Sequence, residues 1–168
     1  DKKMKKITIL CADEGSNLKL AETIYSHLTT KNAKPNLINL IQWEVPLYTY
    51  KTETVLGIPD IVKEFSKTCK ESNGFVIVSP EYNGTIPPVL SSAIAWATRA
   101  SDNWRAAFNE KSVGIASYSW TGAANLFASL RIHLSYIGMN VLARPIPVTP
   151  DKPLVKDDLI AVCDQLLK

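Results

Sequence analysis

Residues 74–99 read GFVIVSPEYNGTIPPVLSSAIAWATR and divide into three parts. Residues 74–79 are mostly apolar and β-branched, which is typical of a strand buried on both faces of a sheet. Residues 89–99 place apolar side chains at helical spacing. The corner between them holds a rigid proline, a carboxylate, a phenol, an amide and a flexible glycine in consecutive positions, more than a plain connection needs. We therefore expect a strand–loop–helix unit whose loop does more than join two elements.

The same alternation of short apolar runs and helical runs continues along the chain. Strands are predicted at residues 5–11, 35–41, 74–79, 111–117 and 141–146, and helices at residues 16–30, 60–72, 89–99, 123–136 and 157–167. Residues 42–59 contain Pro46, Gly57 and Pro59 and are predicted to be irregular. This alternation predicts an α/β fold with helices on both faces of a parallel sheet. The expected form is a flavodoxin-like, doubly wound five-stranded parallel sheet of order 2-1-3-4-5, in one domain over residues 1–168.

The composition limits the kinds of partner. The 168 residues are 46% hydrophobic and 21% charged, with a net charge of +3. These values are ordinary for a globular domain, and the charge is too small to indicate a nucleic-acid partner. No apolar run approaches membrane-spanning length, so no membrane partner is expected. Three cysteines without a CxxC pair suit a reducing compartment, which favours a cytoplasmic location.

Three loops are expected to build a ligand site, because sheets of this order bind ligands at the carboxyl ends of their strands. These loops are residues 12–17, 79–85 and 117–122. In the first loop, Ser16 and Asn17 lie at a predicted helix start, where unpaired N–H groups attract phosphate. The alternative is that Ser16 is only an N-cap.

The second and third loops present polar and flat groups. Pro80 and Gly84 favour a tight turn or a close approach of the backbone to a ligand. The alternative for this loop is a plain turn with Glu81 and Tyr82 in solvent. The third loop, SYSWTG, offers serine hydroxyls and a flat indole, and its alternative is a serine-rich turn with a packed Trp120.

Residues 80–96, PEYNGTIPPVLSSAIAW, resemble the signature of the NADPH-dependent FMN reductase family, whose typical form is PEYNGS-IPG-LKNALDW. The third loop of that family reads roughly S-x-G-x-x-G-G, with Leu-Arg seven and eight residues after the last glycine. The positions of this chain that match it are Ser117, Ser119, Gly122, Ala123, Leu130 and Arg131. The resemblance extends over nearly the whole chain and is densest in the second loop.

The resemblance implies an FMN site and an NAD(P)H-dependent oxidoreductase. Hydride would pass from NAD(P)H to FMN and on to a flavin, a quinone, an azo compound or a metal oxyanion, with no essential side-chain acid. The ring would lie against Pro80, Glu81, Tyr82 and Asn83, whose backbone N–H groups would bond its N5, O4 and N3 edge. The other implied cofactor-binding residues are Ser16 and Asn17 near the phosphate, Gly84 in the turn, and Ser117, Ser119 and Gly122 in the third loop.

The resemblance also implies a homodimer or homotetramer. Three aromatic residues, Trp96, Trp104 and Tyr118, are candidates for a shared apolar surface. The irregular residues 47–56 are a candidate for contact with a neighbouring subunit.

The first loop departs from the family. The family usually has G-S-x-R-x-x-S-x-N there, whereas this chain has LCADEGSN, without the arginine and with Asp13 and Glu14. A carboxylate near a phosphate is repulsive, so weakened FMN binding is expected. Ser119 and Ala123 replace glycines and narrow the third loop.

Two alternatives belong to other functional classes. A signalling receiver domain would explain the acidic Asp13 and Glu14 and the pair Arg144-Pro145, but the third strand ends without a phosphorylatable aspartate. A flavin-free relative that uses the fold for binding would explain the acidic first loop. Hydrolysis is poorly supported, because His27 and His133 lie in no motif with a nucleophile, and no metal-ligand spacing occurs.

Overall fold

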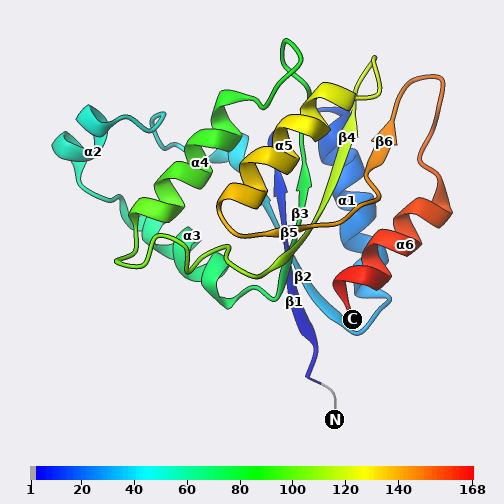
Figure 1. Ribbon diagram of the computed structural model, residues 1–168, viewed down its shortest axis with the longest axis horizontal. Coiled ribbons are helices and arrows are strands. Elements are labelled where there is room, and N and C mark those ends of the chain that lie inside the picture. The colour runs from blue at the N-terminus through cyan, green and yellow to red at the C-terminus, as the bar shows by residue number, and fades with distance from the viewer. Residues whose placement is uncertain (1–2) are drawn as a thin grey trace.

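The computed structural model describes residues 3–168, so the first two residues of the predicted domain lie outside the described residues. The central sheet is parallel and has the order β2-β1-β3-β4-β5, with β6 also paired to β4 (Figure 1). Its strands are β1 (Lys5–Cys11), β2 (Ala33–Asn39), β3 (Gly74–Val78), β4 (Ser112–Tyr118), β5 (Asn140–Val141) and β6 (Ile146–Val148). The predicted strand order and flavodoxin-like fold are confirmed.

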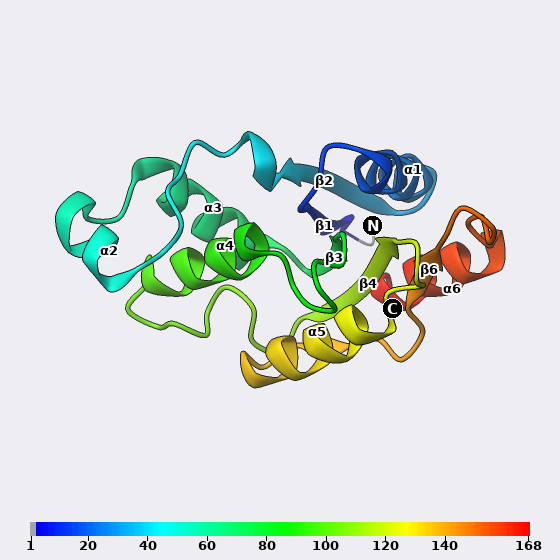
Figure 2. The ribbon, with the colours of Figure 1, turned by 90° about the horizontal axis from the view of Figure 1, so that it is seen from above.

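Helices cover both faces of the sheet (Figure 2). One apolar core, with α1 (Ser16–Thr29) and α6 (Lys156–Leu166), covers one face. The other core, with α3 (Asp60–Glu71), α4 (Pro88–Arg99) and α5 (Ala124–Tyr136), covers the opposite face. Every residue of β3 is buried, as expected for a central strand covered on both faces. Because the strands are parallel, the loops after β1, β3 and β4 lie together at the carboxyl ends of the strands.

The second strand begins and ends two residues before its predicted position. Leu40–Gln42 forms a short 3-10 helix, η1, instead of continuing the strand. The Asn39 side chain accepts the N–H of Ile41 at 3.0 Å, which ends the extended conformation there. Side-chain capping therefore outweighed the apolar pattern that suggested a longer strand.

The fifth strand was predicted at residues 141–146 as a single element, and this was wrong. Two short strands, β5 and β6, pair with different parts of β4, so the sheet formed by residues 3–168 has six strands. Between them, the Arg131 guanidinium donates to the carbonyls of Leu142 and Ala143 at 2.9 and 2.8 Å. Pro145 and Pro147 cannot donate to a strand ladder. The break is stable because an arginine satisfies the carbonyls that the ladder leaves unpaired.

The segment predicted as irregular contains a seven-residue helix, α2 (Tyr50–Leu56). Thr49 caps it by accepting the N–H of Thr52 at 3.0 Å, and none of its residues is buried. The helix is anchored through Glu53, whose carboxylate accepts two hydrogen bonds from Arg99 of α4 at 2.9 and 3.0 Å. It was missed because a helix without a buried face has no apolar periodicity.

The aromatic residues proposed for a shared surface lie in different environments. Trp96 is 1% exposed and donates its indole N–H to the carbonyl of Pro46 at 2.9 Å, so its assignment to a surface was wrong. Trp104 is 41% exposed and stacks on Tyr136. Tyr118 is half-buried at the end of β4.

Within residues 3–168, none of the helices combines the length and the apolar character needed to cross a membrane.

Candidate functional site

A cavity of about 370 Å³ lies where the loops after β1, β3 and β4 meet. It is lined by Asp13, Ser16, Asn17, Pro80, Glu81, Asn83, Gly84, Tyr118, Ser119, Trp120 and Thr121. These loops lie at the upper end of the sheet in Figure 1. The cavity is therefore at the switch point between β1 and β3, where doubly wound sheets bind ligands.

Most of the residues predicted for the site come together there. The lining includes Ser16, Asn17, Pro80, Glu81, Asn83, Gly84 and Ser119. Three predicted residues are not part of it, namely Tyr82, Ser117 and Gly122. Tyr82 is 48% exposed. Ser117 is fully buried and donates its hydroxyl to the carbonyl of Ser79 at 2.6 Å, so it joins the ends of β3 and β4.

The loop after β3 is a two-residue hairpin. Tyr82 and Thr85 exchange two backbone hydrogen bonds of 3.0 Å across Asn83 and Gly84. Those two central residues have φ of 49° and 74°, as a type I′ turn requires, which explains the Asn-Gly pair. The N–H groups of Glu81, Asn83 and Gly84 donate to no acceptor among the described residues. This loop therefore offers free backbone donors beside the cavity.

Glu81 connects the second loop to the third. Its carboxylate accepts the N–H of Leu126 at 2.8 Å and the hydroxyl of Thr121 at 3.1 Å. Leu126 lies in the first turn of α5, whose N-cap residue, Ala123, makes no side-chain cap. Glu81 thus satisfies a helix N–H that has no acceptor within α5, and it holds the two loops together.

Asn17 connects the first loop to the third. It is 2% exposed, and its side-chain oxygen accepts the N–H of Tyr118 at 2.7 Å. Its amide nitrogen donates to the carbonyl of Tyr118 at 3.1 Å and to the Asp13 carboxylate at 3.2 Å. The side chain is therefore committed to holding the loops in place.

The start of α1 offers backbone donors next to Asp13. The N–H groups of Gly15, Ser16 and Asn17 donate to no acceptor among the described residues, and Ser16 is exposed. Gly15, not Ser16, is the N-cap residue, and it makes no side-chain cap. The Asp13 carboxylate accepts the N–H of Glu14 at 2.9 Å. An anion would meet both unpaired N–H groups and a carboxylate here.

Two residues of the lining were not predicted for the site. Thr121 was not predicted at all, and Tyr118 was predicted only as part of a shared apolar surface. Trp120 was expected in the loop, and it lines the cavity with 84% of its surface exposed. Asp13 was expected in the first loop and also lines the cavity.

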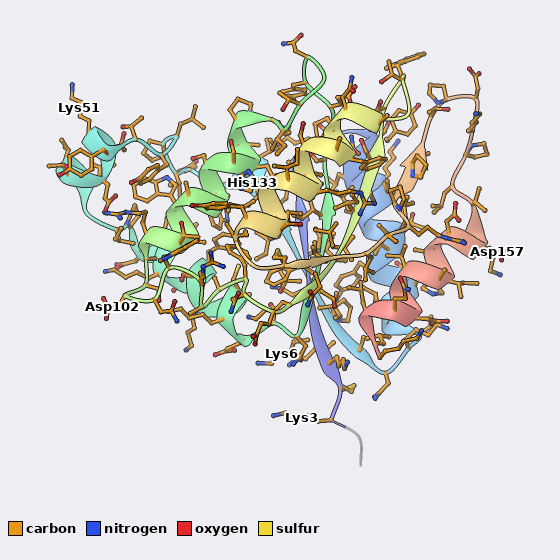
Figure 3. The ribbon with its side chains drawn as sticks, in the orientation of Figure 1. Lys3, Lys6, Lys51, Asp102, His133 and Asp157 are labelled. Carbon is orange, nitrogen blue, oxygen red and sulfur yellow. The ribbon has the colours of Figure 1, made fainter. Side chains whose placement is uncertain are left out.

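No side chain around the cavity is arranged as a nucleophile with a base. Burial raises the pKa of the nearby Cys11 thiol to about 11, so it stays protonated near neutral pH. His133, on α5 and labelled in Figure 3, lines a different cavity together with Ile132 and Tyr136. Within residues 3–168, no group of three or more histidine, cysteine or acidic side chains is placed to hold a metal ion. The lining provides hydrogen-bond donors, two carboxylates and flat aromatic surfaces.

A parallel sheet of this order with such a cavity defines the class of flavodoxin-like proteins. The chain belongs to the NADPH-dependent FMN reductase family, whose pattern matches residues 5–152. The family resemblance predicted from the sequence is thereby confirmed, and it argues against the signalling-receiver alternative.

Known relatives are similar over part of their length. A quinone reductase of Escherichia coli K12 is 34% identical over 71 residues, which are 42% of this chain and 35% of the relative. An NAD(P)H-dependent FMN reductase of Pseudomonas aeruginosa is 30% identical over 103 residues, which are 60% of this chain and 54% of the relative. The matched part thus spans between about a third and about a half of these relatives.

Solved structures share the fold over nearly the whole chain. The flavoenzyme NAD(P)H:(acceptor) oxidoreductase FerB of Paracoccus denitrificans superposes with a TM-score of 0.77 at 19% identity, covering 97% of this chain and 95% of that one. An azoreductase of Bacillus anthracis superposes with a TM-score of 0.65 at 16% identity, covering 98% and 97%.

The lining fits the ring of a flavin. Its free N–H groups, hydroxyls and aromatic faces match a flat ring with a polar edge. The phosphate end fits less closely, because Asp13 stands beside the N–H groups that would receive the phosphate.

Proposed function

We propose that the protein is an NAD(P)H-dependent reductase that holds FMN in the cavity at the carboxyl ends of β1, β3 and β4. The observation that supports this most directly is the Asn83-Gly84 hairpin, which leaves three backbone N–H groups free beside the cavity. FMN bound there would supply the redox chemistry that links NAD(P)H to a second substrate.

The residues of the chain position and tune the flavin. The N–H groups of Glu81, Asn83 and Gly84 would face the polar edge of the ring, where hydrogen bonds alter its electronics. Pro80 and Ser119 would border the ring. Ser16 and the unpaired N–H groups at the start of α1 would approach the phosphate.

Three side chains would hold the loops of the site in position. Asn17, Glu81 and Ser117 each join two loops or strand ends through hydrogen bonds. Tyr82 and Gly122 lie in the same two loops and would support them without lining the cavity. The proposed mechanism needs no side-chain acid or base.

The second substrate is proposed to be a small electron acceptor. The similar proteins are named as quinone reductases, and some structural neighbours as azoreductases, which supports quinones and azo compounds as candidates. Free flavins and metal oxyanions are the other candidates. The exposed Trp120 at the cavity would offer a flat surface for such a ligand.

The chain is further proposed to fold as one domain, to assemble as a homodimer or homotetramer, and to act in the cytoplasm. All three cysteines are free and buried, which supports a reducing compartment. The exposed apolar residues of the 47–56 segment, Leu47, Tyr50, Val55 and Leu56, support contact with a second subunit.

The test is a titration of the flavin-free protein with FMN and FAD, followed by flavin fluorescence. We expect FMN to bind in preference to FAD, because the loop after β1 is short and forms one phosphate site. The loaded protein should oxidise NADPH and reduce benzoquinone. A protein that binds neither flavin would support the alternative of a flavin-free relative.

A further inference from the structure

The charge of the cavity is unusual for a site that receives a phosphate. Its described lining contains two carboxylates, Asp13 and Glu81, and no lysine, arginine or histidine. The two carboxylates differ in their surroundings. Glu81 accepts a helix N–H and a hydroxyl between the second and third loops. Asp13 lies at the phosphate end of the cavity, beside Ser16 and the start of α1.

Asp13 is held in position by two hydrogen bonds. One oxygen accepts the N–H of Glu14 at 2.9 Å, and the other accepts the Asn17 amide at 3.2 Å. Asn17 is itself buried and bonded on both sides to the backbone of Tyr118. The Asp13 carboxylate therefore cannot turn to solvent without losing both bonds. Glu14 differs from it, because it is exposed and does not line the cavity.

Two effects oppose each other at this end of the cavity. The unpaired N–H groups of Gly15, Ser16 and Asn17 and the helix dipole attract a phosphate. The fixed carboxylate of Asp13 repels it, and a phosphate monoester carries close to two negative charges at neutral pH. Neither effect acts strongly on the flavin ring, because the oxidised ring is neutral.

We propose that this site recognises the flavin by its ring and not by its phosphate, and that Asp13 is the residue that sets this specificity. The proposal rests on the proposed flavin-binding function and names riboflavin-type flavins, without a phosphate, as ligands of the same site. FMN and riboflavin then bind with similar affinity.

The experiment compares two ligands and two matched variants. The flavin-free wild type, Asp13→Asn and Glu14→Gln are titrated with FMN and with riboflavin at low salt. The wild type should bind both flavins within about threefold of each other. Asp13→Asn should bind FMN about tenfold more tightly, with riboflavin changed by less than about twofold. Glu14→Gln removes the same charge from an exposed position. It should change the affinity for either flavin by no more than about twofold.

A salt titration of the wild type tests the same repulsion without a substitution. Raising the salt concentration should increase the affinity for FMN relative to that for riboflavin, because screening weakens the repulsion between Asp13 and the phosphate. A wild type that binds FMN more than about thirtyfold more tightly than riboflavin would overturn the inference while leaving the proposed function standing. The inference would also be overturned if Asp13→Asn left the ratio of FMN affinity to riboflavin affinity unchanged, or if that ratio fell as the salt concentration rose. Failure of every variant to bind either flavin would overturn the proposed function, and this inference with it.

Discussion

Replacing Glu81 with alanine should both destabilise the protein and weaken flavin binding. The carboxylate accepts the Leu126 N–H at 2.8 Å in the first turn of α5, a helix whose own N-cap residue, Ala123, provides no side-chain cap. It also accepts the Thr121 hydroxyl at 3.1 Å. The alanine variant leaves both donors to solvent and frees the third loop from the second.

The size of the effect follows from these two bonds. Loss of a helix-capping acceptor costs about 0.5–2 kcal/mol, and a hydrogen bond to a charged group contributes about 1.5–3 kcal/mol. Since Glu81 is half-buried, we expect a loss of about 1.5–2.5 kcal/mol in the free energy of unfolding. For a domain of this size, that corresponds to a fall in Tm of about 4–8 °C. The FMN affinity should fall about five- to tenfold, because loop ordering becomes part of the binding free energy.

The matched control is Glu81→Gln. The amide keeps an acceptor for Leu126 and a donor for Thr121, so this variant should lose less than about 1 kcal/mol and keep most of its flavin affinity. Thermal unfolding by circular dichroism and FMN titration measure both quantities. The reasoning would be refuted by an alanine variant whose Tm and FMN affinity equal those of the wild type, or by two variants that lose equally.

Four further predictions concern other parts of the structure. Gly84→Val should lower FMN affinity while the far-ultraviolet circular dichroism stays native, since φ of 74° suits glycine and not a β-branched residue; tight binding by this variant would mean that the hairpin is not the ring site. Ala123→Gly should raise the free energy of unfolding in urea by about 0.5–1 kcal/mol, because alanine is strained at φ of 59°, and an unchanged midpoint would argue against strain there. Burial lowers the pKa of His133 in the folded state, so the unfolded state binds the proton first as pH falls. The free energy of unfolding should therefore decline below about pH 6.5, the ordinary pKa of histidine. His133→Asn should make this decline shallower, and an identical dependence of stability on pH in the variant would contradict the prediction. Arg99→Ala removes the ion pair that anchors α2 through Glu53, and limited proteolysis should then cut residues 47–57 faster than in the wild type; equal rates would show that other contacts hold the helix.

The strands and helices were accessible from the sequence because they depend on local patterns, and their regular alternation predicted the doubly wound order of the sheet. Buried strands such as β3 read as continuous apolar runs, and α1 and α4 read as apolar residues at helical spacing. The corner at residues 80–84 was recognisable because a rigid proline, polar side chains and a flexible glycine directly follow a buried strand. The hairpin that Asn83 and Gly84 form there was not predicted. The predicted features depend on neighbours in the sequence, so they predicted the fold and the position of the cavity.

The tertiary structure decided what each side chain of the site does, because the partners lie far apart in the chain. Asn17 bonds to a residue 101 positions away, and Glu81 to one 45 positions away. Ser117 and Ser119 look alike in the sequence, yet the buried hydroxyl of Ser117 donates to the Ser79 carbonyl, whereas Ser119 lines the cavity. The anchored α2 and the divided edge strand likewise depend on Arg99 and Arg131, whose partners come from other elements. A hydrogen bond between distant segments leaves no periodic trace in either of them, so only the folded chain reveals it.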